Sequence, residues 1–369
     1  DGQLVADQCL VGDHRAEEAV DRPVQRLARP AILALPPVDI AGAPLAGTVR
    51  LDANENPYAP LVQGQPGINR YPDPQPETLR RRLADLYGVG RDSLWVTRGS
   101  DDAIDLLIRC FCEAGRDQVA MVEPTFSAYA QFARVQGAGV VAANLTAGFA
   151  FDAAAVLAAF RGHSPKLLFL CTPNNPTGTA VAAADVRRIA EALPDTIVVA
   201  DEAYGEFDDQ PSLASEAGAI PNLVVLRTLS KAYGLAGARI GCAIGSPALI
   251  ELLARVSPPY PLPGPSIDAA LDALGPERMP IHRQRIADLI EERRRLADLL
   301  RGELPPVCLA PADHHVRAAG RLLPLGLGRQ ALAGPARVGV GLEEAHVAGG
   351  RVGLDRHHAV QGEGVPLAV

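Results

Sequence analysis

The middle of the chain alternates short apolar runs with longer segments in which apolar residues recur at helical spacing. The apolar runs are four to six residues long and are bounded by turn residues, a pattern that predicts strands buried on both faces. They lie at residues 93–97, 118–122, 166–171, 196–200 and 223–226. Such strands, separated by helices, indicate an α/β fold with a mostly parallel sheet and flanking helices.

Three amphipathic segments predict helices around this sheet. Residues 101–113 carry Asp101 and Asp102 in the first turn, where carboxylates stabilise a helix N-terminus, and apolar residues at helical spacing after them. Residues 185–193 and 281–300 show the same spacing. We expect the last helix to lead into a smaller, incomplete C-terminal domain.

Aromatic residues occur in only part of the chain. All sixteen Phe, Tyr and Trp residues fall between Tyr58 and Tyr260, and from Arg301 onward Ser, Thr, Asn, Lys and Ile are missing as well. A packed core normally uses aromatic and Ile side chains. We therefore expect residues 305–369 to be a translation in the wrong reading frame, and a genuine but divergent or disordered tail is the alternative.

Composition excludes several classes of protein. The net charge of −8 disfavours a nucleic-acid partner, and no apolar run reaches the about 18 residues of a membrane span. The six Cys are scattered without zinc-site spacing, and the pairs at His314–His315 and His357–His358 lack supporting carboxylates, so no metal site is expected. Buried reduced thiols, and an N-terminus without signal-peptide features, favour a soluble cytoplasmic protein.

Four of the predicted elements border unusual polar residues. These are Arg-Gly-Ser-Asp at 98–101, Pro-Asn-Asn-Pro-Thr-Gly at 173–178, Asp-Glu-Ala-Tyr at 201–204 and Thr-Leu-Ser-Lys at 228–231. Each alone has an ordinary structural explanation, such as a turn or a helix cap. Ligands of open α/β sheets bind at the carboxyl ends of the strands, however, so we expect these segments to supply parts of one site.

One of only two lysines stands in the last of these segments. Lys231 follows a strand, has Ser230 beside it and has Arg239 eight residues further on, whereas Lys166 precedes a strand and lacks this context. A lysine amine in such a place is a candidate for a Schiff base. Ser230, Arg239 and the amides that begin the helix at Asp101 would bind a phosphate.

The other segments offer partners for an aromatic ring. Asp201 could pair with a ring nitrogen, and Tyr204 and Asn175 could form hydrogen bonds with a phenolic oxygen. A cofactor with a phosphate, a pyridine nitrogen, a phenolate and an aldehyde is pyridoxal 5′-phosphate (PLP).

These motifs, in this order, resemble those of the fold-type-I PLP-dependent aminotransferases, and most of all the histidinol-phosphate aminotransferase branch. The resemblance extends from about Arg29 to about Leu304. It is carried by LDANENPYAP (51–60), NRYPDPQP (69–76), RGSDDAIDLLIRCFCEAGRD (98–117), PTFSAY (124–129), CTPNNPTG (171–178), VVADEAYGEF (198–207), LRTLSKAYGLAGARIG (226–241) and SPPYPLPGPS (257–266).

The resemblance implies specific roles. The catalytic residues would be Lys231, which carries the Schiff base, Asp201 and Tyr204. Asn54 would border the substrate, and Tyr71 would reach the phosphate of the partner subunit's cofactor, which implies a homodimer with shared sites. The cofactor-binding set would be Ser100, Asp101, Phe126, Asn175, Asp201, Tyr204, Ser230, Lys231, Arg239 and Tyr71.

It also implies a division of the chain and a reaction. Residues 1–28 would be an atypical disordered segment, 29–57 an arm bordering the active site, 58–265 the large PLP-binding domain, and 266–304 a linking helix and the start of a small domain. The implied reaction converts L-histidinol phosphate and 2-oxoglutarate into imidazole-acetol phosphate and L-glutamate, in histidine biosynthesis.

Two alternatives remain open. One is a related enzyme, either an aminotransferase for aromatic or other amino acids or a PLP-dependent decarboxylase for a phosphorylated amino acid. The other is a catalytically dead remnant that still binds PLP, because the substrate-gripping Arg residues that relatives carry near the C-terminus have no counterpart in residues 305–369.

Overall fold

The computed structural model describes residues 24–36, 51, 53–62 and 67–303. Two segments that the sequence singles out lie outside the described residues. These are residues 1–23 of the atypical N-terminal segment and the whole of 305–369, so the reading-frame hypothesis stays a prediction.

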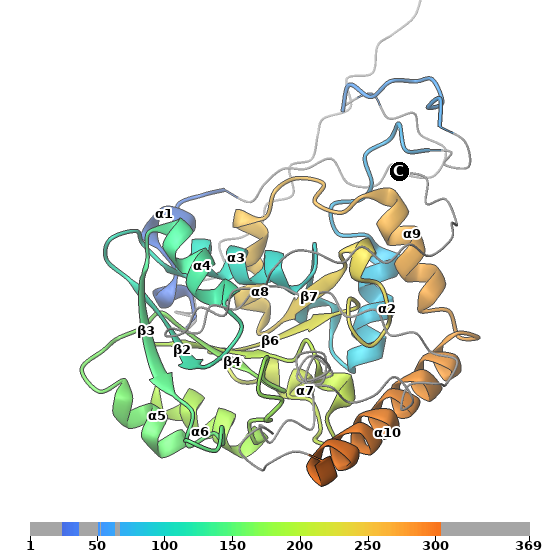
Figure 1. Ribbon diagram of the computed structural model, residues 1–369. Helices are drawn as coiled ribbons and strands as arrows, with labels where there is room; N and C mark the ends of the chain where they lie inside the picture. The colour runs from blue at the N-terminus through green and yellow to red at the C-terminus, as the bar shows by residue number, and fades with distance from the viewer. Residues whose placement is uncertain (1–23, 37–50, 52, 63–66, 304–369) are drawn as a thin grey trace, which may run out of the picture. The chain divides into compact units, whose positions relative to one another are not determined.

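A seven-stranded sheet runs through the described part of the chain (Figure 1). The strands are β1 (Leu94–Thr97), β2 (Gln118–Glu123), β3 (Gly139–Asn144), β4 (Leu167–Cys171), β5 (Ile197–Asp201), β6 (Leu223–Thr228) and β7 (Gly241–Ile244). Their spatial order is β1-β7-β6-β5-β4-β2-β3. Neighbours from β6 to β3 pair in parallel, whereas β7 is antiparallel to both β6 and β1. The predicted mostly parallel sheet is confirmed.

The central strands are buried because helices cover both faces of the sheet. Every residue of β4, β5 and β6 is buried, as their continuous apolar runs predict. Alternate side chains enter opposite cores: Leu168 and Val198 face one, and Phe169 and Val199 face the other. Two strands were not predicted from the sequence: the edge strand β3, in which one of six residues is buried, and β7, which has four residues.

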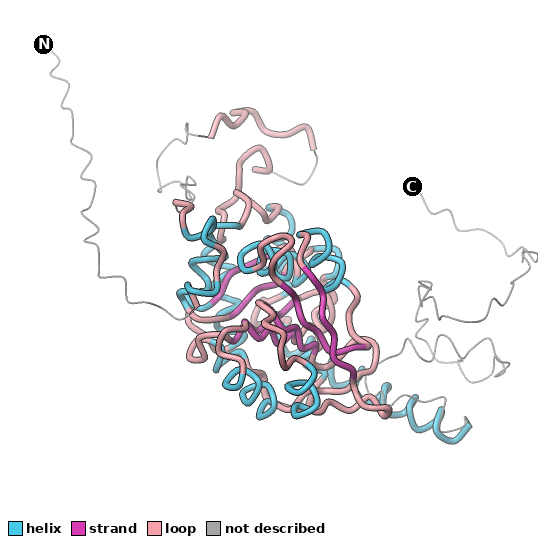
Figure 2. Tube along the Cα trace, turned by 90° about the vertical axis from the view of Figure 1, so that its left-hand side faces the viewer, coloured by secondary structure: helices cyan, strands magenta, loops and turns pink. Residues whose placement is uncertain are grey.

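Two layers of helices sandwich the sheet (Figures 1 and 2). One layer holds α3 (Ser100–Phe111), α4 (Ala128–Gln136) and α8 (Pro247–Val256). The opposite core holds side chains of α2 (Glu77–Tyr87), α5 (Ala153–Ala159), α6 (Ala183–Ala192), α7 (Ala214–Ala217) and α9 (Gly264–Ala273). α9 begins at Gly264 and packs into this core, and the division of the chain at 265 stays a prediction.

The structure differs from the expected disorder at residues 24–28. The short helices η1 (Gln25–Leu27) and α1 (Pro30–Leu33) pack on the α3–α8 layer, with Leu27 and Ile32 buried. Arg29 donates to the carboxylate of Glu113 at 2.9 Å and to the Arg109 carbonyl, and Arg255 donates to the Leu33 carbonyl. Burial of a few apolar side chains and these polar contacts hold a segment that composition alone marks as atypical.

The predicted long helix is α10 (Met279–Glu303), which begins where His282 contacts the Ala273 carbonyl. Its charged residues keep it polar. None of the helices in the described ranges is long and apolar enough to cross a membrane, and those ranges contain no group of three His, Cys, Asp or Glu side chains arranged to hold a metal ion.

Candidate active site

The four polar segments meet at one edge of the sheet. Asp201 ends β5 and pairs in register with Cys171, the last residue of β4. Thr97 of β1 and Thr228 of β6 both pair with Gly241 of β7, so the residues that follow these two strands are neighbours. The predicted convergence at the carboxyl ends of the strands is therefore what the topology produces.

Asp201 is a buried carboxylate at the centre of this edge. It is 2% exposed, and its two oxygens accept hydrogen bonds from the Tyr129 hydroxyl at 2.7 Å and from the Ala203 amide at 3.1 Å. Burial raises the pKa of Asp201 to about 6, while these two donors oppose that rise. A buried carboxylate of this kind is well suited to pair with a cation.

Tyr129 is a site residue that the sequence analysis missed. It lies in α4, within the quoted segment 124–129, and is fully buried. Burial raises the pKa of its phenol well above the usual value, so Tyr129 stays a hydrogen-bond donor. Its place on the inner face of an amphipathic helix predicts only a core residue, and nothing local points to Asp201, 72 positions away.

Two glycines form a cradle at the N-terminus of α3. A Cβ on Gly241 would lie 2.6 Å from the carbonyl carbon of Gly99 and 2.7 Å from the amide nitrogen of Ser100. A Cβ on Gly99, whose φ is +76°, would lie 2.6 Å from the Arg239 guanidinium. Only glycine allows this close approach, which leaves backbone amides and a guanidinium together at a helix N-terminus, where anions bind.

Arg239 reaches this cradle from the chain after β6. Its guanidinium donates to Ser230 Oγ at 3.3 Å and to the Asp101 carboxylate at 3.1 Å. Ser230 Oγ also accepts from the Thr228 hydroxyl at 3.0 Å. Arg239 has φ +55°, a left-handed conformation that costs a non-glycine residue energy and is held by its surroundings. The structure thus brings together the predicted phosphate-site residues Ser100, Asp101, Ser230 and Arg239.

Lys231 and Tyr204 lie beside each other. The Lys231 ammonium is 5.4 Å from the centroid of the Tyr204 ring, a cation–π contact. Lys231 is exposed and Tyr204 is half-buried. Lys166, in contrast, precedes β4 at the opposite edge of the sheet, where its amide bonds to the Gln118 carbonyl. Lys166 therefore lies at the amino ends of the strands, whereas Lys231 follows β6 at the carboxyl ends, where Asp201 ends the neighbouring strand β5.

The two asparagines of segment 173–178 have different surroundings. Asn174 is buried, donates to the Pro124 carbonyl at 2.9 Å and to Thr177 Oγ1 at 2.8 Å, and accepts from Thr125. Asn174 thus holds two loops together. Asn175 is half-buried and follows this anchored residue, and the half-buried Phe126 meets the Tyr129 ring edge-on at 5.6 Å.

The remaining predicted residues, Asn54 and Tyr71, lie in the segments 51–60 and 69–76, outside this cluster. Asn54 is exposed with φ +52°, and Tyr71 is 51% exposed and stacks on Tyr260 at 4.4 Å. The buried carboxylate of Glu55 accepts from the Tyr71 amide at 2.6 Å and from Arg70 at 3.0 Å. Glu55 therefore ties the segment 51–60 to the segment 69–76.

A buried ion-pair network lies under the loop that follows β5. Arg227 donates to Glu202 at 2.7 Å and to Glu206 at 2.6 Å, and all three side chains are less than 10% exposed. Glu202 also accepts from Ser212 and from the Leu213 amide. This network fixes the turn between Asp201 and Phe207, which contains Tyr204.

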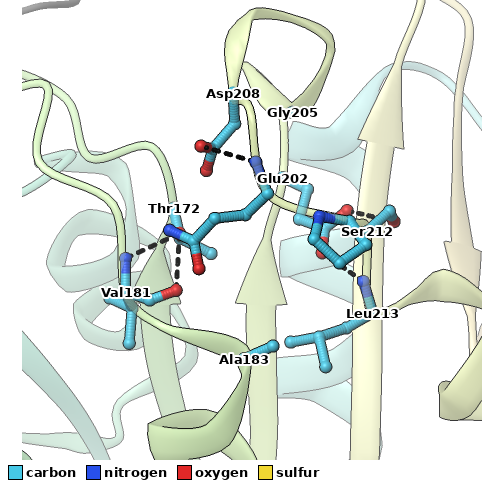
Figure 3. Close-up of a pocket in the computed structure, with 10 residues that line it drawn as sticks. Thr172, Val181, Ala183, Glu202, Gly205, Asp208, Ser212 and Leu213 are labelled. Atoms are coloured by element: carbon cyan, nitrogen blue, oxygen red, sulfur yellow. Dashed lines mark hydrogen bonds between the residues drawn. The ribbon is translucent and has the colours of Figure 1, made fainter.

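The pocket in Figure 3 lies beside this network and holds none of the predicted site residues. Glu202, Asp208 and Ser212 line it. At its wall the Val181 amide donates to Thr172 Oγ1 at 2.9 Å. Its volume of about 20 Å³ is room for about one water molecule. We therefore assign the candidate site to the Asp201–Lys231–Arg239 cluster.

Comparisons with known proteins show which family the chain resembles in sequence. Histidinol-phosphate aminotransferase of Xanthomonas euvesicatoria is 45% identical over 260 residues, which cover 69% of this chain and 72% of the relative. The enzyme of the same name from Xylella fastidiosa is 42% identical over 260 residues, covering 69% and 71%.

Solved structures give the same result for the fold. Histidinol-phosphate aminotransferase from Sinorhizobium meliloti, in complex with pyridoxal-5′-phosphate, is 27% identical with a TM-score of 0.58, and the match spans 63% of each chain. Aspartate aminotransferase from Thermus thermophilus with maleate is 26% identical with a TM-score of 0.55, spanning 63% of this chain and 64% of that one. Residues 46–315 match the family described as aminotransferase class I and II. The chain belongs to this family.

Proposed function

We propose that the chain is a PLP-dependent aminotransferase that acts on L-histidinol phosphate and 2-oxoglutarate, as its relatives' names suggest. The observation that carries the cofactor assignment is the buried Asp201 carboxylate, which lies at the same sheet edge as Lys231 and the Gly99–Gly241 cradle. One chain thus offers separate partners for a ring nitrogen, an aldehyde and a phosphate.

The cradle fits a phosphate monoester. The amides of Ser100 and Asp101 begin α3, and Ser230 and Arg239 add a hydroxyl and a guanidinium. Arg239 donates to Asp101 in the structure, and a bound phosphate would offer it a stronger, doubly charged acceptor. Arg239 would then exchange one acceptor for another at little cost in desolvation, because it is exposed.

The ring would lie between Phe126 and the sheet edge. Asp201 would hold a proton on the ring nitrogen, and Asn175 and Tyr204 would donate to the phenolic oxygen. When bound, PLP supplies an electron sink for the bonding electrons of the substrate carbon. Lys231 would hold the cofactor covalently through its aldehyde group and, as a free amine, would move the proton at the substrate Cα.

The segment 51–60 would contribute to a second copy of the chain. Its described residues expose apolar side chains, among them Leu51 at 83% and Tyr58 at 79%. Exposed apolar residues in one segment are typical of a protein interface. We propose a homodimer in which Tyr71 reaches the phosphate of the partner's cofactor and Asn54 borders the substrate.

A labelling experiment tests the cofactor assignment. The chain has two lysines, so borohydride reduction of the protein mixed with PLP, followed by peptide mapping, has a simple readout. We expect the label on Lys231, and Lys231→Met to lose it while Lys166→Met keeps it. A label on Lys166, or no bound cofactor in the parent, would refute the assignment.

An assay panel tests the substrate. The full chain should transfer the amino group of L-histidinol phosphate to 2-oxoglutarate faster than that of L-phenylalanine or L-aspartate. Faster transfer from an aromatic amino acid would favour the related aminotransferases, and release of carbon dioxide from a phosphorylated amino acid would favour a decarboxylase. Bound PLP with no turnover of any of these would identify an inactive cofactor-binding chain.

A further inference from the structure

We propose that Tyr129 is a positioning residue that keeps the Asp201 carboxylate ionised and oriented toward the ring nitrogen of the cofactor. This inference rests on the proposed function, because it concerns the residue that would pair with that nitrogen. It assigns a role to a side chain that touches neither the substrate nor the cofactor's reacting atoms.

Two aromatic contacts hold the buried ring of Tyr129 in place. The side chain is 0% exposed, and its ring stacks on Phe169 with centroids 4.6 Å apart and planes at 10°. Phe126 packs edge-on against the same ring. Clamped in this way, Tyr129 places its hydroxyl 2.7 Å from Asp201 Oδ2, a short hydrogen bond to a carboxylate.

The two donors form hydrogen bonds with different oxygens of the Asp201 carboxylate. Tyr129 bonds to Oδ2 from α4, and the Ala203 amide bonds to Oδ1 from the loop after β5. A carboxylate has about four lone-pair positions, so others remain for a ring nitrogen. Since the donors come from two different elements, rotation of the carboxylate about its own bond would break both hydrogen bonds.

The charges around Asp201 make this support necessary. Asp101 of α3 and the neighbouring Glu202 are acidic, and both raise the pKa of Asp201, as burial does. The Cys171 thiol of β4 is neutral, since burial raises its pKa to about 12. Tyr129 and the Ala203 amide act in the opposite direction by stabilising the anion. Without the phenol, Asp201 would hold its own proton more strongly and compete with the ring nitrogen for it.

A matched pair of substitutions separates this role from simple packing. Tyr129→Phe keeps the ring and removes the hydroxyl that bonds to Asp201. Tyr87→Phe is the control, because the Tyr87 hydroxyl is also buried but has no hydrogen-bond partner among the described residues. Both variants are compared with the parent as holoenzymes, loaded with PLP that is ¹⁵N-labelled in the ring.

The first readout is the ¹⁵N chemical shift of the bound ring nitrogen, measured between pH 6 and pH 9. We expect the parent and Tyr87→Phe to show a protonated nitrogen throughout, and Tyr129→Phe to show a shift toward the unprotonated value. The second readout is the PLP dissociation constant, expected to rise about 10-fold to 100-fold in Tyr129→Phe, the range for losing a hydrogen bond to a charged group.

The outcomes distinguish this proposal from the function on which it rests. If Tyr129→Phe matches Tyr87→Phe in both readouts while the parent binds PLP on Lys231, Tyr129 is only a core residue and the proposal is wrong. If the parent itself binds no PLP, the proposed function and the proposed role of Tyr129 are both wrong. Unequal melting temperatures of the two variants with equal ¹⁵N shifts would also reject the proposal, since they would show a packing effect alone.

Discussion

Gly241 of β7 packs directly against Gly99, which precedes α3, and the space between them is too small for a methyl group. A Cβ on Gly241 would come within 2.6 Å of the Gly99 carbonyl carbon and within 2.8 Å of the Arg227 carbonyl oxygen. These neighbours are backbone atoms of two other segments, so neither can rotate out of the way. The antiparallel strand that interrupts the parallel sheet therefore holds the start of α3 against β6, where the candidate phosphate site lies.

Gly241→Ala should open this cradle. We expect it to lower the free energy of unfolding by about 1–3 kcal/mol, the usual cost of overpacking, and to weaken PLP binding as α3 moves away from Ser230. Urea unfolding and a PLP titration measure the two effects.

Gly237→Ala is the matched control for this change. A Cβ on Gly237 would meet nothing within 4 Å, and its φ lies outside the left-handed range. It should therefore leave both measurements near the parent values. Equal PLP affinity in Gly241→Ala and Gly237→Ala would show that the close glycine packing does not shape the cofactor site.

Arg239 should matter for the cofactor more than for the fold. Arg239→Ala removes the guanidinium and should weaken PLP binding by about 1.5–3 kcal/mol, the range for a hydrogen bond to a charged group. Arg239→Gly removes the same group but also relieves the left-handed backbone at φ +55°. We therefore expect the Gly variant to be more stable than the Ala variant by thermal melting and to bind PLP equally weakly. Parent-like PLP affinity in either variant would contradict the phosphate site.

Much of the fold was predictable because the strands are short, apolar and separated by amphipathic helices. Asp201 ends β5 and Lys231 follows β6, and these two strands pair in parallel, so both residues are expected at the same ends of the strands once the strands are recognised. Burial of β4 and β5 on both faces is likewise expected from their uninterrupted apolar runs.

Contacts between distant helices and strands were not predictable in this way. Tyr129 and Asp201 are 72 positions apart, and α4 presents Tyr129 at the same helical spacing as Ala133, a simple core residue. β7 is a four-residue strand that begins with glycine, so its apolar residues are too few to predict a strand. Its antiparallel direction depends on the turn at 234–240, which sequence periodicity does not encode.

The buried ion pairs of Arg227 could have been predicted from the sequence. Arg227 directly follows the apolar run 223–226 and lies within β6, where a charge in a strand buried on both faces needs a partner. Glu202 and Glu206 provide it from the loop after β5. A search for acidic residues after the neighbouring strand would have found them.

Asp201 should make the stability of the cofactor-free protein depend on pH. Its pKa is about 6 in the folded chain against 3.8 for an ordinary Asp, so the folded state holds the proton more tightly. Relative to Asp201→Asn, the parent should lose about 3 kcal/mol of unfolding free energy as the pH rises from about 4 to about 6, and no more above that. Urea unfolding of both proteins across this range measures the difference, and a difference that does not change with pH would show that the folded chain does not raise the pKa of Asp201. Asp201→Asn should also keep PLP but slow transamination severely, because the ring nitrogen loses its anionic partner.

Arg227→Met should destabilise the fold strongly, although Arg227 lies outside the proposed cofactor site. The substitution keeps a long, unbranched side chain but leaves the buried Glu202 and Glu206 without a cation, and burial already raises the pKa of Glu206. Removing one partner of a buried ion pair costs about 3–5 kcal/mol, because the remaining charge is neither solvated nor paired.

Arg187→Met is the control, since Arg187 makes an equally short ion pair with Glu216 at 2.6 Å but on the surface, where both side chains are more than a third exposed. Surface pairs contribute about 0–1 kcal/mol, so urea unfolding should separate the two variants clearly. Equal losses would mean that the Arg227 network is compensated by solvent or by neighbours, and that it does not hold the turn that carries Tyr204.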